Sequence, residues 1–159
     1  MTLAPADQAN LTQWERIQRI AWIAFFLSSL FYIPIGFILA RTRFVEPPVI
    51  AGTGFLRLIF YAAAIALFIG VVLIRRRHHA RVFADLASAL AASQTAGMLC
   101  WVLMEAISIL GLVLVILGGS LLQALPFLVA GPIGIAWARP DAARLGSQIM
   151  GRGPAPPIG

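Results

Sequence analysis

The chain has 159 residues, of which 60% are hydrophobic and only 11% are charged, with a formal net charge of +6. A typical soluble domain carries about 25% charged residues, so these charges are too few to cover a surface that faces water. The composition therefore excludes an ordinary soluble domain and predicts an integral membrane protein. All 12 basic side chains are arginines that lie near the ends of apolar runs, so we expect no nucleic-acid partner.

The N-terminal part of the chain predicts a short interfacial helical segment that leads into a first membrane span. Leu11, Trp14 and Ile17 recur at helical spacing, with charged residues around them. Tryptophan is enriched at the level of the lipid headgroups, where we expect Trp14. The apolar run 17–40 that follows is long enough to cross a hydrocarbon core of about 30 Å.

Further apolar runs predict three more spans, at 55–74, 95–117 and 121–137. Pro47 and Pro48 indicate a loop after the first span, and Gly118 and Gly119 indicate a tight turn after the third.

The predicted fold is therefore an all-α membrane protein with four transmembrane helices arranged as two hairpins. Short interfacial helical segments are expected near the N-terminus and before the third span. Residues 1–159 form a single domain, and the proline- and glycine-rich tail, 140–159, is expected to be loose.

Small residues predict close helix packing in two of the spans. Ala62, Ala66 and Gly70 lie four residues apart on one face of the second span, and Gly111 lies within the third. Small side chains let membrane helices approach closely, so we expect all four residues at helix contacts.

The densest charge cluster is RRRHHAR at 75–81. We expect anionic lipid headgroups to contact its arginines, which are Arg75, Arg76, Arg77 and Arg81. The two adjacent histidines would point about 100° apart on a helix, so no metal site is predicted.

Residues 82–92 contain strong helix formers, and two alternatives stay open for them. The segment either lies along the membrane surface or belongs to a third helix that starts near Arg81 and projects into the cytoplasm.

The distribution of arginines predicts the orientation in the membrane. With four spans, nine arginines lie on the side of the two termini and three on the other side. Positive charge is enriched on the cytoplasmic side, so both termini are expected in the cytoplasm, and we expect the inner membrane of a bacterium.

Glu105 is the only formal charge between residues 94 and 119 and lies about halfway along the third span. A carboxylate there costs about 2.5 kcal/mol or more unless it is paired, hydrated or protonated. No arginine lies in the middle of a span. The remaining options are a proton, a water-filled pocket, a coupling ion or a group from another subunit.

A polar stripe surrounds this carboxyl group on the predicted helix. Gln94, Trp101, Glu105 and Ser108 share one face, and we expect Ser108 to hydrogen-bond the carboxyl and Trp101 to shield it. These four residues form the predicted proton- or ion-binding site.

Residues 105–113, EAISILGLV, resemble the ion-carrying helix of the rotor-ring proteolipid (subunit c) of rotary ATP synthases. The resemblance is confined to the third span. It implies that Glu105 binds and releases a proton or sodium ion. It also implies that the small-residue face of the second span takes the place of the family's glycine-rich inner helix.

No set of side chains suited to catalysis or cofactor binding can converge in this sequence. Cys100 is the only cysteine, and no histidine lies within a span. We therefore expect a non-enzymatic packing or accessory subunit of a membrane assembly, without cofactors. Its expected partners are the lipid bilayer and either other membrane subunits or copies of itself. The alternative is a proton- or ion-translocating subunit that uses Glu105.

Overall fold

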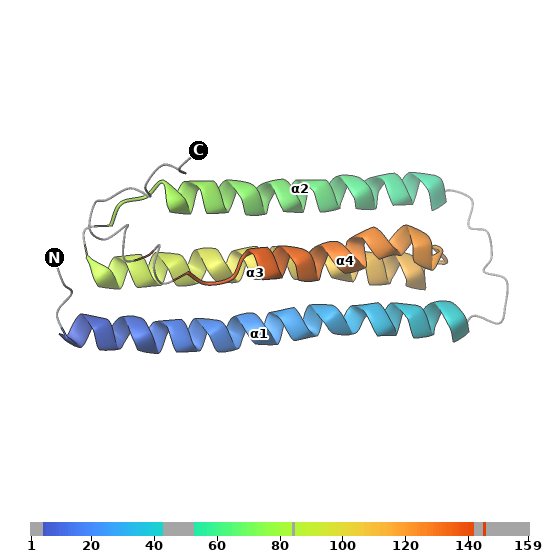
Figure 1. The fold of residues 1–159 in the computed structure, drawn as a ribbon. Helices are drawn as coiled ribbons and strands as arrows, with labels where there is room; N and C mark the ends of the chain where they lie inside the picture. Colours follow the sequence, from blue (N-terminus) through green and yellow to red (C-terminus); the bar gives the residue numbers. More distant parts are fainter. Residues whose placement is uncertain (1–4, 43–52, 84, 142–144, 146–159) are drawn as a thin grey trace, which may run out of the picture.

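The structure, a computed structural model, describes residues 5–42, 53–83, 85–141 and 145. The described residues form four helices and no strand, which confirms the all-α prediction. The helices run side by side along one long axis (Figure 1). They are α1 (Pro5–Thr42), α2 (Thr53–His79), α3 (Leu86–Ile116) and α4 (Leu121–Trp137).

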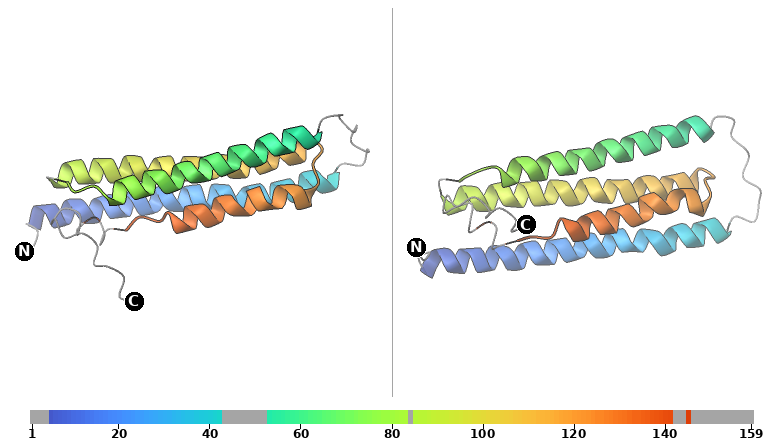
Figure 2. Two further views of the ribbon diagram at one scale, coloured as in Figure 1. Left: turned by 90° about the horizontal axis from the view of Figure 1, so that it is seen from above. Right: turned by 45° about the horizontal axis from the view of Figure 1, so that its top comes forward.

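Three of the helices are long and apolar enough to cross a membrane, namely α1, α2 and α3. They indicate an integral membrane protein. The fourth helix is shorter, because its 17 residues span about 26 Å at a rise of roughly 1.5 Å per residue. The end of α4 therefore lies short of the ends of its neighbours (Figure 2).

The centre of the fold is α3, which packs against each of the other three helices. In addition, α1 packs against α4, whereas α1 and α2 have little contact with each other. The first two helices therefore do not form a packed hairpin, although they are consecutive in the chain. Buried side chains of α3 fill the core, including Trp101, Met104 and Ile107.

Glycines allow α4 to lie directly on α3. A Cβ atom added at Gly111 would lie 2.7 Å from Phe127 Cβ and 3.1 Å from the Ala124 carbonyl oxygen. The tight turn between these helices contains Gly118 with a φ of 98°, a conformation that glycine adopts readily. Ser120 then caps α4 through a reciprocal pair of hydrogen bonds with Gln123.

Side chains from the other three helices cap the C-terminal end of α4. Trp22 Nε1 donates to the Ile135 carbonyl oxygen at 2.7 Å, Arg75 Nη1 to that of Trp137 at 2.6 Å, and Trp101 Nε1 to that of Ala138 at 2.9 Å. The last carbonyls of a helix lack partners within it, and here α1, α2 and α3 each supply one donor.

The helical segments expected near the N-terminus and before the third span are continuous with α1 and α3. Of the two alternatives for residues 82–92, the structure agrees with an extended third helix, because residues 86–92 belong to α3. Helix α3 starts at Leu86, where Asp85 Oδ1 accepts a hydrogen bond from Ser88 N at 2.7 Å. Trp14 of α1, Ala89 of α3 and Leu145 form a small apolar cluster. This packing explains why both helices continue beyond their most apolar runs.

Other predictions fall outside the described residues. The loop around Pro47 and Pro48 lies outside them, as does most of the predicted tail, 142–144 and 146–159.

Candidate functional site

The Glu105 carboxyl group has two hydrogen-bond partners on α1. Ser28 Oγ donates to Glu105 Oε1 at 2.6 Å, and Tyr32 Oη donates to the same oxygen at 3.1 Å. Ser28 and Tyr32 are four residues apart, so they lie on one face of the helix. Each hydrogen bond to a charged group contributes about 1.5–3 kcal/mol, which offsets part of the cost of placing a carboxylate there.

A second pair of hydroxyl groups lies beside this cluster. Ser29 Oγ and Ser108 Oγ are 3.0 Å apart, and both residues are fully buried. A Cβ atom added at Gly131 would overlap Ser108 Oγ and lie 3.0 Å from Ser29 Oγ. The backbone of α4 at Gly131 thus packs directly against this serine pair. Ser108 bonds Ser29 rather than the Glu105 carboxyl group that we expected it to bond.

Two other members of the predicted stripe, Trp101 and Gln94, do not hydrogen-bond the Glu105 carboxyl group. The Trp101 indole donates to the Ala138 carbonyl oxygen and lies 5.9 Å from the Phe25 ring, centroid to centroid. Gln94 is exposed and lies 11 residues before Glu105, about 16 Å along the helix axis. The structure therefore brings Trp101, Glu105 and Ser108 towards α1 and leaves Gln94 away from the carboxyl group.

Glu105 lies at the edge of an apolar face of α3. It is half-buried, and Val102 and Ile109, about 60° and 40° away around the helix, are exposed. Within the described residues, Glu105 makes no ion pair. The carboxyl group is thus held by hydroxyl donors and remains partly accessible from the side of α3 that neither α1 nor α2 covers.

The small residues predicted at helix contacts fall in different places. Ala66 and Gly70 line an apolar groove of about 580 Å³ between α2 and α3, with Ala106 on the opposite wall. Gly111 contacts α4 instead, and Ala62 is exposed.

The arginines of the 75–81 cluster also differ from one another. The Arg75 guanidinium bonds the Trp137 carbonyl oxygen and lies 3.9 Å from the centroid of the Trp137 ring. Arg76, Arg77 and Arg81 are exposed. Contact with lipid headgroups remains the prediction for all four arginines. No group of three or more potential metal ligands occurs in the part of the chain that the structure describes.

Sequence reasoning missed Ser28 and Tyr32, the partners of the carboxyl group. The available signal was their spacing of four within the apolar run 17–40, because polar groups in a membrane helix bond across to neighbouring helices.

The resemblance of residues 105–113 to the rotor-ring proteolipid remains a prediction. Comparisons with models of known protein families, with curated proteins and with solved structures found no match.

Proposed function

We propose that this protein crosses the bilayer four times, with both termini in the cytoplasm, and is a non-enzymatic accessory subunit of a membrane assembly. The 17 residues of α4 reach the lower limit of length for a membrane span. The last carbonyl oxygens of α4 accept hydrogen bonds from side chains of the protein, as a helix that ends inside a bilayer requires. Both features support the fourth crossing. The face that contacts a partner is the side of α3 between α1 and α2.

One observation carries this proposal: α1 and α2 both pack on α3 but have little contact with each other. The face left between them contains the groove walled by Ala66, Gly70 and Ala106. Exposed Ile109 lies in the same groove, and Glu105 lies at its edge. Small side chains allow a partner helix to approach, and a carboxyl group at the edge supplies a directional contact.

Photo-crosslinking in native membranes tests this role. A photoreactive amino acid replaces Ile109 in one variant and Ile133 of α4, which is also exposed, in the control. We expect a discrete protein adduct from position 109 and only lipid adducts from position 133. Lipid adducts alone from both positions, or a protein adduct only from position 133, would show that the face between α1 and α2 is not the contact.

A second candidate function is reversible proton binding by Glu105, whose carboxyl group accepts hydrogen bonds from Ser28 and Tyr32 and makes no ion pair within the described residues. A carboxyl group held by two hydroxyls inside an apolar helix bundle can exchange a proton without a permanent cation partner. A membrane-permeant carbodiimide, which reacts with protonated carboxyl groups, should label Glu105 in a pH-dependent way. Glu105→Gln supplies the unlabelled control. A carboxyl group that stays unreactive at every pH in native membranes would rule this candidate out.

A further inference from the structure

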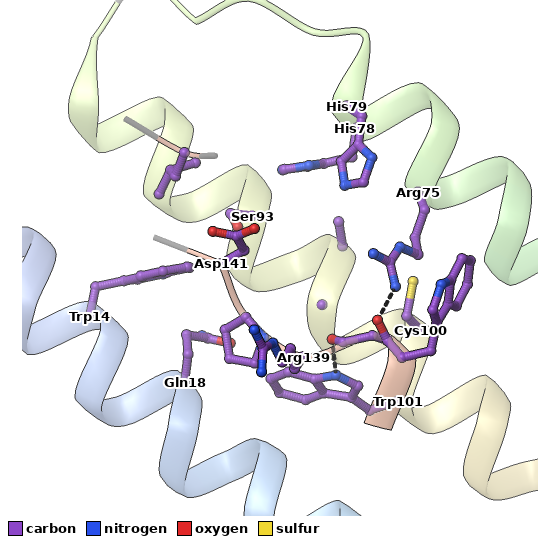
Figure 3. Close-up of a pocket in the computed structure, with 16 residues that line it drawn as sticks. Trp14, Gln18, Arg75, His78, His79, Ser93, Cys100, Trp101, Arg139 and Asp141 are labelled. Carbon is purple, nitrogen blue, oxygen red and sulfur yellow. Dashed lines mark hydrogen bonds between the residues drawn. The ribbon is translucent and has the colours of Figure 1, made fainter. Parts of the chain in front are cut away.

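A cavity of about 300 Å³ lies beyond the C-terminal end of α4 (Figure 3). It exists because α4 stops short while α1, α2 and α3 continue (Figure 1). All three long helices line it, together with residues 138–141 that follow α4. Its volume is at the lower end of the range for ligand-binding pockets, about 300–1,000 Å³.

Two hydrogen bonds fix the wall that residues 138–141 form. Trp101 and Arg75 donate to the carbonyl oxygens of Ala138 and Trp137, at 2.9 and 2.6 Å. The start of this wall is therefore held in place by side chains of α3 and α2.

Buried polar groups of α1 line this cavity. Gln18 is one of them and is only 2% exposed. The Trp14 indole nitrogen is also buried and has no hydrogen-bond acceptor among the described residues. Leaving a buried polar group unsatisfied costs about 1–3 kcal/mol, so the Trp14 indole indicates that the cavity receives a polar ligand.

The balance of charges around the cavity favours an anion. Arg75 of α2 and Arg139 of the wall after α4 carry positive charge (Figure 3). Asp141 supplies the one opposing carboxylate among the described residues that line the cavity.

We propose that this cavity binds the phosphate group of an anionic ligand. Arg75 and Arg139 supply positive charge, and the Gln18 amide and Trp14 indole supply hydrogen-bond donors. Two sources share this chemistry: the headgroup of an anionic phospholipid, and a phosphate compound from the aqueous phase. The proposal does not depend on Glu105 or on the face between α1 and α2.

Binding to the purified full-length protein in a zwitterionic detergent tests the proposal. The probes are short-chain phosphatidylglycerol, inorganic phosphate and, as the control without net charge, short-chain phosphatidylcholine. Intrinsic tryptophan fluorescence and the unfolding temperature are followed during each titration, since a ligand that binds only the folded state raises that temperature. Phosphatidylglycerol alone should saturate if the source is a lipid, and inorganic phosphate should also saturate if the source is aqueous.

Two charge-matched variants separate a built site from general attraction. Arg139→Gln removes a lining charge, whereas Arg16→Gln removes an exposed charge of α1 that does not line the cavity. We expect Arg139→Gln to weaken binding about tenfold and Arg16→Gln to leave it within about twofold. Gln18→Met should weaken binding while retaining the side-chain volume.

The proposal is wrong if no anionic probe saturates, or if phosphatidylcholine binds as tightly as phosphatidylglycerol. Equal weakening by Arg139→Gln and Arg16→Gln would also overturn it, because the attraction would then belong to the overall positive charge. If Gln18→Met does not fold, the comparison of the two arginine variants still decides the result, since both arginines are exposed.

Discussion

Replacing Gly131 with alanine tests the contact on which the packing of α1, α3 and α4 depends. The added Cβ atom would overlap Ser108 Oγ and would lie 2.9 Å from the Met104 carbonyl oxygen and 3.0 Å from Ser29 Oγ. Overpacking of this kind costs about 1–3 kcal/mol, and loss of the serine–serine hydrogen bond adds about 0.5–1.5 kcal/mol. Alanine regains up to about 1 kcal/mol of helix propensity. We expect a net destabilisation of about 2 kcal/mol.

The same change at Gly70 is the matched control. There the nearest atom to an added Cβ is Leu103 Cδ1 at 3.8 Å, which is ordinary van der Waals contact. The free energy of unfolding is measured for both variants by titration of the detergent-solubilised protein with sodium dodecyl sulfate, followed by tryptophan fluorescence. If Gly131→Ala is as stable as Gly70→Ala, α4 does not approach the serine pair as the structure places it.

Three further predictions concern side chains with defined partners. A double-mutant cycle of Ser28→Ala and Glu105→Ala should give a coupling energy of about 1 kcal/mol in unfolding experiments, and zero coupling would contradict the hydrogen bond between them. Arg75→Gln should destabilise the protein by about 1–2 kcal/mol and Arg77→Gln by less than about 0.5 kcal/mol in the same assay, because only Arg75 caps α4. Burial, and next the charge of a nearby arginine, lowers the pKa of His78, which lies beyond the apolar run 55–74. The folded state then binds its proton less readily than the unfolded state, so stability should fall as the pH drops below 6.5, and His78→Gln should flatten that pH dependence.

The helices were predictable because their signal is local. The apolar runs 17–40, 55–74, 95–117 and 121–137 all lie within helices except at the end of the third, which stops at Ile116. The tight turn after α3 also follows from its two adjacent glycines. By contrast, the long extensions of α1 and α3 depend on contacts between Trp14 and Ala89, which a search for apolar runs does not detect.

The helix neighbours were harder to predict, because connectivity does not determine them. A short turn forces α3 and α4 together, but ten residues, 43–52, separate α1 from α2 in the sequence. That separation leaves room for α3 to contact both helices. The expectation of two packed hairpins was therefore met by the second pair only.

The candidate site was predictable only in part, for the same reason. Glu105 was identifiable as a carboxyl group in an apolar run. Its partners Ser28 and Tyr32 are 77 and 73 residues away, and their contact depends on the rotation of α1 against α3. Ser108 lies on the expected face, yet its hydroxyl is directed to Ser29, whose position follows from the same rotation.

In the proposed arrangement of four spans, the capped end of α4 has a consequence for the surrounding lipid. A helix of about 26 Å is roughly 4 Å shorter than a typical hydrocarbon core, and such mismatch usually thins the bilayer or draws water towards the bare helix end. Here Trp22, Arg75 and Trp101 satisfy the last carbonyls from within the protein. The acyl chains beside α4 can therefore keep their full extension, and the protein itself absorbs the difference in length.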